Sequence, residues 1–135
     1  MPAILVDANI EGQGAHIWMR MQSSQWREFT TALDLSFQTF REVGLNQDST
    51  DAIVWRFCQQ KSLYLLTSNR NEDSETSLQT TLRREGTAES LPVFTLPFAD
   101  RVYSSQAFLD RVVEKLLDYL LDPHNIVGTG RLYLP

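Results

Sequence analysis

Short apolar runs that end in polar residues recur along the chain and predict its strands. Residues 3–6 run unbroken into Asp7, and residues 63–67 end in the same way. Continuous runs of this kind are typical of strands covered on both faces, as in a parallel sheet. Residues 35–40 alternate and predict another strand. Residues 92–97 predict one more, and the prolines at both ends favour a short or edge strand.

Between these runs the apolar residues recur every three or four positions, which predicts helices. The first spans residues 15–33, with a break into two helices at Ser23-Ser24, and follows a flexible polar turn at residues 11–14. Others span residues 51–60 and 75–85. Residues 41–50 form a polar loop. The last helix is capped by Ser104 or Ser105 and carries paired apolar residues every four positions. This stripe predicts a core face, with a partner helix as the alternative.

Strands that alternate with helices predict an α/β fold in three layers, α/β/α, around a small and mainly parallel sheet. The length of 135 residues suits a single domain. We assign residues 1–122 to that domain. Residues 123–135, which contain Gly128 and Gly130, are predicted to form a C-terminal arm lying on the surface.

Composition narrows the classes of protein that this chain can belong to. Apolar residues make up 42% of it, the net charge is −5 and Cys58 is the one cysteine. No apolar run approaches the roughly 20 residues that a membrane span needs, and the start lacks the features of a secretion signal. We therefore expect a cytoplasmic protein without a membrane partner. The acidic balance argues against charge-driven coating of nucleic acid, but allows a local basic patch or a bridging metal.

Asp7 and Asp51 are the candidate catalytic residues. Strand polarity places Asp7 and the segment after Thr67 at the carboxyl edge of the sheet, and the loop before Asp51 would bring that carboxylate there too. Carboxylates that converge repel each other unless a cation such as Mg²⁺ or Mn²⁺ lies between them. The plainer interpretation is that Asp7 bonds a turn and Asp51 favours a helix start.

Three short motifs follow one another between residues 4 and 71. Residues 6–9 read Val-Asp-Ala-Asn, and residues 51–55 read Asp-Ala-Ile-Val-Trp after a Gly-Leu at 44–45. Residues 65–71 read Leu-Leu-Thr-Ser-Asn-Arg-Asn. In this order and spacing the motifs resemble those of PIN-like domains, in particular a group of short bacterial proteins of unknown function. The resemblance implies a PIN-like fold and, in active members, RNA cleavage that depends on Mg²⁺ or Mn²⁺.

Carried over by position, the resemblance makes Asp7 and Asp51 catalytic metal ligands. It gives Asn9 and Thr67 supporting positions.

The third motif departs from the family pattern. Asn69 and Asn71 stand where the family carries acids. An amide oxygen still ligates a hard cation, but it brings no negative charge. Asp73 and Glu75 lie just beyond these positions, and Asp73 is the carboxylate that would substitute.

Three hypotheses about function remain open. The first is a metal-dependent ribonuclease, such as the toxin of a toxin–antitoxin pair. The second is a non-catalytic PIN-like module that binds RNA or a protein partner such as an antitoxin, or that forms a homodimer through its C-terminal amphipathic helix. The third is a response-regulator-like or nucleotide-binding domain with Asp7 as phosphoryl acceptor, but neither paired acids nor a suitably placed lysine accompanies Asp7.

Overall fold

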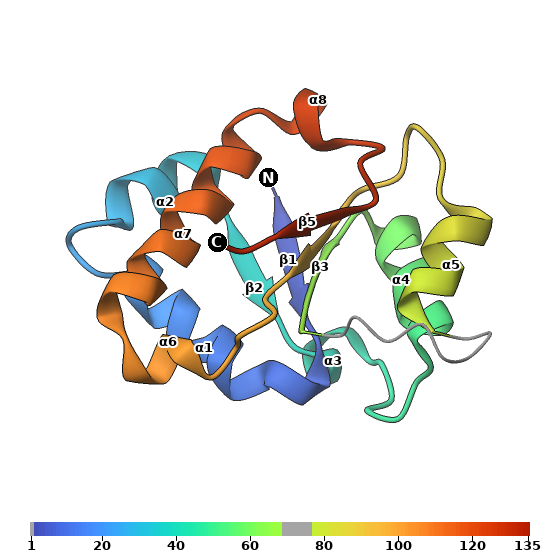
Figure 1. Ribbon diagram of the computed structural model, residues 1–135, viewed down its shortest axis with the longest axis horizontal. Helices are drawn as coiled ribbons and strands as arrows, with labels where there is room; N and C mark the ends of the chain where they lie inside the picture. Colours follow the sequence, from blue (N-terminus) through green and yellow to red (C-terminus); the bar gives the residue numbers. More distant parts are fainter. Residues whose placement is uncertain (1, 69–76) are drawn as a thin grey trace.

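A five-stranded parallel sheet forms the centre of the molecule (Figure 1). The computed structural model describes residues 2–68 and 77–135. The strands lie in the order β2-β1-β3-β4-β5, and every pairing between neighbours is parallel. Their bounds are β1 Ala3–Val6, β2 Ser36–Gln38, β3 Tyr64–Thr67, β4 Val93–Thr95 and β5 Arg131–Tyr133.

Helices cover both faces of the sheet, so the predicted three-layer α/β/α fold is confirmed. In Figure 1, α1, α2, α6 and α7 lie on one side of the strands and α4 and α5 on the other. The helical bounds are η1 Ala8–Ile10, α1 Glu11–Met21, α2 Arg27–Leu33, α3 Phe40–Val43, α4 Asp51–Lys61, α5 Leu78–Glu85, α6 Arg101–Ser104, α7 Gln106–Leu121 and α8 Pro123–Ile126. No helix in the described part of the chain has the length and apolar character needed to cross a membrane.

Alternate residues of β1 enter two separate cores, because successive side chains of a strand point to opposite faces. Ile4 and Val6 pack in the cluster formed with α1 and α7. Leu5 packs with Val54 and Trp55 of α4 on the other face. Both faces of β1 are therefore buried, which explains its unbroken apolar run.

The predicted apolar stripe of α7 belongs to the larger core. Its buried positions are Phe108, Leu109, Val112, Val113, Leu116, Leu117 and Leu120. Leu121, which the same pattern includes, is 62% exposed at the end of the helix. Ser105 caps α7 as predicted, since its hydroxyl accepts a hydrogen bond from the backbone N–H of Phe108 at 3.1 Å.

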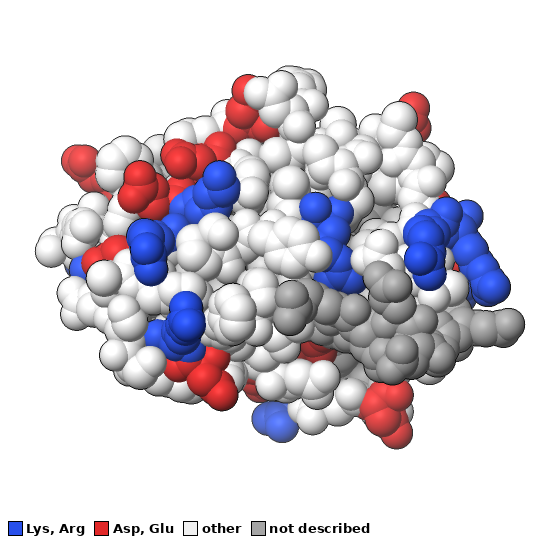
Figure 2. Space-filling view, in the orientation of Figure 1, with Lys and Arg blue, Asp and Glu red and all other residues white. Residues whose placement is uncertain are grey.

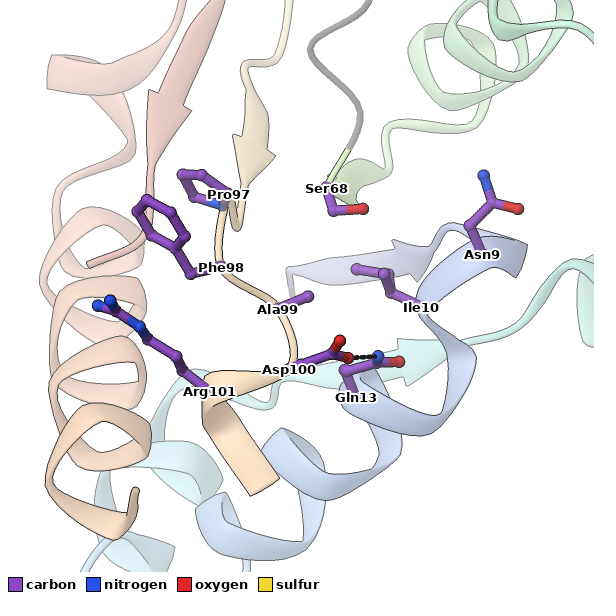
Figure 3. A pocket seen from close by; sticks show the side chains of 9 residues that line it. All are labelled: Asn9, Ile10, Gln13, Ser68, Pro97, Phe98, Ala99, Asp100 and Arg101. Atoms are coloured by element: carbon purple, nitrogen blue, oxygen red, sulfur yellow. Dashed lines mark hydrogen bonds between the residues drawn. The ribbon is translucent and has the colours of Figure 1, made fainter. Parts of the chain in front are cut away.

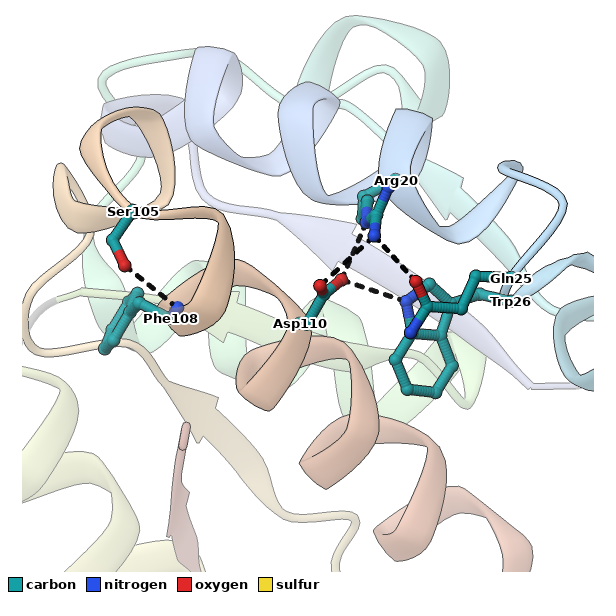
Figure 4. Close-up of polar contacts among 6 residues, drawn as sticks. All are labelled: Arg20, Gln25, Trp26, Ser105, Phe108 and Asp110. Atoms are coloured by element: carbon teal, nitrogen blue, oxygen red, sulfur yellow. Dashed lines mark hydrogen bonds and ion pairs between the residues drawn. The ribbon is translucent and has the colours of Figure 1, made fainter.

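A polar junction joins α1, α2 and α7 next to this core (Figure 4). The Asp110 carboxylate of α7 accepts hydrogen bonds from Arg20 Nε at 2.7 Å and Arg20 Nη2 at 3.1 Å. It also accepts one from Trp26 Nε1 at 3.1 Å, just before α2. Arg20 donates a further bond to Gln25 at 2.8 Å. One carboxylate thereby fixes three helices relative to one another.

Several predictions along the first half of the chain need correction. Residues 11–14 are the first turn of α1 instead of a flexible turn, and residues 40–43 of the predicted strand and loop form α3. Gly14 permits the close approach of α1 to β1, because an added Cβ would overlap Val6 Cγ1. The predicted break at Ser23-Ser24 is confirmed, since α1 ends at Met21 and α2 starts at Arg27.

The C-terminal segment was predicted as a surface arm, and this is wrong for its last residues. Arg131–Tyr133 forms the edge strand β5, and Leu134 is 1% exposed. Gly128 and Gly130 have φ values of 80°, a backbone conformation that suits glycine and leads the chain back to the sheet. With β5 beside it, β4 is not an edge strand. Its flanking prolines lie outside Val93–Thr95, where they remove no hydrogen bond of the strand ladder.

Candidate functional site

The carboxyl ends of β1, β3 and β4 meet at one edge of the sheet, as their parallel pairing requires. The chain passes from β1 to β2 on one side and returns to β3 on the other, so the strand order reverses between β1 and β3. Open α/β sheets bind ligands in the crevice at such a reversal. Asp7 follows β1 directly and Ser68 follows β3, so both lie at this point.

The Asp7 carboxylate is held by the neighbouring strand. Its Oδ2 accepts a hydrogen bond of 2.6 Å from Thr67 Oγ1, and its backbone N–H donates to the Leu66 carbonyl at 2.9 Å. Its Oδ1 accepts the Asn9 backbone N–H at 3.3 Å and so caps η1. Thr67 is fully buried, whereas Asp7 is partly exposed. Thr67 therefore fixes one oxygen of a carboxylate that solvent reaches.

Asp51 occupies the first turn of α4, where Thr50 is the capping residue. Its Oδ2 accepts the backbone N–H of Leu78, the first residue of α5, at 3.1 Å. The carboxylate thus joins the N-terminal ends of α4 and α5. Its negative charge is stabilising there, because the N-terminal end of a helix carries a partial positive charge. The structure describes no bond between Asp51 and Asp7.

Cys58 belongs to α4 and packs in the core on that side of the sheet. Burial raises the pKa of its thiol to about 12, and the negative charge of Asp7 acts in the same direction. Cys58 is 1% exposed, which fits the behaviour of a small apolar residue and not of a nucleophile.

Three of the metal ligands predicted from the sequence, Asn69, Asn71 and Asp73, lie outside the described residues. Within residues 2–68 and 77–135, no three His, Cys, Asp or Glu side chains lie close enough together to form a metal site. Asn9 is exposed and lines the pocket described next.

A pocket of about 530 Å³ opens at the same edge of the sheet, lined in part by Asn9 and Ile10, which follow Asp7 closely in sequence (Figure 3). Its lining comes from the segments that follow β1, β3 and β4 and from α1 and α6: Asn9, Ile10, Gln13, Ser68, Pro97, Phe98, Ala99, Asp100 and Arg101. Gln13 Nε2 donates to Asp100 Oδ1 at 2.8 Å. The Arg101 guanidinium carbon lies 4.7 Å from the centre of the Phe98 ring.

No protein-family model, curated protein or solved structure matches this chain. The similarity to PIN-like domains therefore rests on the three sequence motifs, and the chemistry of the site rests on its own geometry.

The sequence motifs did not single out Gln13, Ser68, Asp100 or Arg101. The rule that selected Asp7 applies equally to the residues after β4, because β4 is parallel to β1 and ends at the same edge. Applied to residues 97–101, it would have found Asp100 and Arg101. Gln13 lies 87 residues before Asp100, and only the packing of α1 against α6 reveals their contact.

The side chains at this edge present oxygen ligands. They include the Asp7 carboxylate, the Asn9 amide and the Ser68 hydroxyl. Mg²⁺ binds through one or two carboxylates, several waters and the phosphates of a substrate. Oxygen donors of this kind favour a hard cation over a soft, thiolate-binding metal, and Asp7 is the one carboxylate among these three side chains.

Proposed function

We propose that this chain is a metal-dependent ribonuclease of the PIN-like kind, toxin-like in type, that acts in the cytoplasm. The observation that carries the proposal is the partly exposed Asp7 carboxylate at the reversal of strand order, oriented by Thr67 at 2.6 Å. Asp51, Asn69, Asn71 and Asp73 are the further ligands that this proposal requires.

Each of the described residues has a separate task in this proposal. Asp7 binds the cation through the lone pairs that Thr67 and the Asn9 N–H leave open, since each carboxylate oxygen accepts more than one bond. Thr67 keeps the carboxylate in one orientation, as residues behind metal ligands commonly do. A bound Mg²⁺ or Mn²⁺ would activate water and stabilise the charge that develops on the phosphate.

Two observations favour the alternative, a non-catalytic PIN-like module that binds RNA or a protein partner. The Asp51 carboxylate already bonds the first residue of α5. A groove lined by Trp26, Phe29 and Leu121 between α2 and α7 adds exposed apolar surface, with Phe29 51% exposed and Leu121 62% exposed. Such a surface suits an antitoxin-like partner or a second copy of the chain.

Calorimetric titration with Mn²⁺ and then Mg²⁺ tests the proposal on the full chain. Asp7→Asn keeps an acceptor for Thr67 but removes the charge, and we expect it to weaken binding by at least tenfold. Thr67→Val keeps the shape of the buried side chain, and we expect about 10- to 100-fold weaker binding. Asp118→Asn, an exposed change of the same charge on α7, is the matched control.

The same proteins are then tested for manganese-dependent cleavage of single-stranded RNA. Metal binding and cleavage that both disappear in Asp7→Asn but persist in the control support the ribonuclease. Metal binding without cleavage supports the non-catalytic module. Metal binding that is unchanged in Asp7→Asn contradicts the assignment of Asp7 as a ligand.

A further inference from the structure

A second pocket lies between α1 and the end of β2. Its volume is about 180 Å³, and its lining shares no residue with the pocket shown in Figure 3. Pockets that hold drug-sized ligands usually measure about 300–1,000 Å³. This pocket is smaller, so it suits a compact ligand or one end of a longer one.

The walls of this second pocket are apolar and aromatic. Val6, which is buried, and Ala15 contribute aliphatic surface. Trp18 of α1 and Phe37 of β2 also line it, and their rings stack with centroids 5.0 Å apart and planes 29° apart. Both aromatic side chains are only partly buried, so a ligand that enters the pocket can reach them.

The charged side chains that line the pocket are two carboxylates, Glu11 of α1 and Glu42 of α3. Glu42 Oε1 accepts the Thr39 backbone N–H at 3.0 Å and the Thr39 hydroxyl at 3.1 Å, and so completes the capping box of α3. Among the described residues, no hydrogen bond or ion pair engages Glu42 Oε2 or the Glu11 carboxylate. The pocket therefore combines aromatic walls with negative charge.

We propose that this pocket binds an organic ammonium cation, with its carbon groups against Trp18 and Phe37 and its charge near Glu11 and Glu42. Aromatic rings attract such cations through the negative charge of their faces, and quaternary ammonium groups are recognised in aromatic pockets. An anion would be repelled by the carboxylates. A metal ion such as Mg²⁺ takes oxygen ligands and would gain nothing from the aromatic walls.

The charge of the surface also favours a cation here. Figure 2 shows Lys and Arg side chains in separate groups over α7, over the middle of the sheet and over α5. Acidic side chains occur along the lower edge of this view, where α1 and α3 lie in Figure 1. The whole chain has a net charge of −5. A cleft lined by charges of one sign raises the local concentration of the opposite ion, which adds to the contacts inside the pocket.

This inference goes beyond the proposed ribonuclease and does not depend on it. None of the residues that line the pocket is a proposed metal ligand, so binding of the cation needs neither Asp7 nor a metal. The ammonium group has two sources, a small free amine or the side chain of a lysine in a protein partner. Both sources present the same chemistry to the pocket, and the experiment separates them.

Binding of choline to the full chain is measured by calorimetry with a chelator and no added divalent metal. The comparison probe is its neutral carbon analogue, dimethylbutanol, in which a carbon atom replaces the charged nitrogen. We expect choline to bind with a dissociation constant of about 1 mM or lower. It should bind at least about tenfold more tightly than the neutral alcohol, because only choline carries the charge that the rings and carboxylates attract.

Three variants locate the binding site. Glu11→Gln and Glu42→Gln each remove one charge, and glutamine also serves in a capping box, so each should weaken choline binding by about two- to fivefold. Ala15→Met keeps every charge but places a larger side chain in the pocket from an exposed helical position, and it should weaken binding by at least about tenfold. Glu114→Gln, the same charge change at an exposed position of α7, is the matched control and should leave binding unchanged.

A second titration compares a glycine–serine peptide that contains one lysine with the same peptide containing glutamine. Tighter binding of the lysine peptide, lost in Ala15→Met, supports a lysine side chain as the ligand, and binding of choline alone supports a small free amine. Equal binding of choline and the neutral alcohol, no binding of either cation at about 10 mM, or choline binding that persists in Ala15→Met overturns the proposal. Because no metal is present, this failure differs from a loss of metal binding at Asp7.

Discussion

Replacing Asp110 by Asn tests how much the polar junction of α1, α2 and α7 contributes to stability. The carboxylate accepts three hydrogen bonds, two from Arg20 and one from Trp26, and the ion-paired side chains are 21% and 26% exposed. An exposed ion pair contributes up to about 1 kcal/mol, whereas charged hydrogen bonds contribute about 1.5–3 kcal/mol each when buried. For this half-buried junction we expect a loss of about 2 kcal/mol in the free energy of unfolding.

This loss of free energy predicts a decrease in the melting temperature, Tm. Unfolding of 135 residues has an entropy of about 0.28 kcal/mol/K, from about 2.1 cal/mol/K per residue. A loss of about 2 kcal/mol then lowers Tm by about 7 °C. Thermal unfolding followed by circular dichroism at pH 7 measures it, with Asp118→Asn on the same helix as the control of equal charge change.

The difference in stability between the wild type and Asp110→Asn should also depend on pH. The hydrogen bond from Arg20 lowers the pKa of the Asp110 carboxyl, burial opposes this and the Trp26 bond adds to it. A lowered pKa in the folded state means that the stabilisation is complete above about pH 4, the ordinary value for Asp, and is lost as pH falls through the folded value. The wild type and Asp110→Asn should therefore converge in acid. A Tm difference below about 2 °C at pH 7, or one that persists unchanged in acid, would refute the reasoning.

Three further predictions concern packing and the thiol. Leu134→Ala should lower the free energy of unfolding by about 2–4 kcal/mol in urea titrations, because Leu134 is buried. The control, Leu121→Ala at an exposed site, should change it by less than about 0.5 kcal/mol. Gly14→Ala should cost about 1–3 kcal/mol in the same assay, since the new methyl group overlaps Val6; no loss would show that α1 can move away from β1. Cys58, with a pKa of about 12, should react with a thiol reagent at pH 8 only after unfolding, and rapid reaction of the native protein would contradict its burial.

Much of the fold could be predicted because continuous or periodic apolar positions indicate both the type of an element and its buried face. The unbroken run of β1 and the paired apolar positions of α7 each specify one element with a buried face. The strand β5 could not be predicted, because the three residues after Gly130 show no period, and they stay partly or fully exposed even when paired with β4.

The sequence predicts which site residues lie together only where the direction of the strands is sufficient to place them. Asp7 follows β1 and Thr67 ends the neighbouring strand β3, so their contact follows from parallel pairing. The Gln13–Asp100 contact depends on how two helices pack, and no local pattern reports that. The position of Asp51 at a helix start could be read from the sequence. The hydrogen bond from the backbone N–H of Leu78 to the Asp51 carboxylate could not, because it depends on how α4 and α5 pack.

The strand order has a consequence for how the protein folds. Ala3 pairs with Ser36 and Ile4 with Tyr64, and even the most local pairing, Leu65 with Val93, encloses a helix. No two strands of this sheet form a hairpin, so no part of the sheet can nucleate from a short segment. The crevice at Asp7 is created only when β1 pairs with β3, and that pairing joins residues further apart in sequence than any other pairing of the sheet.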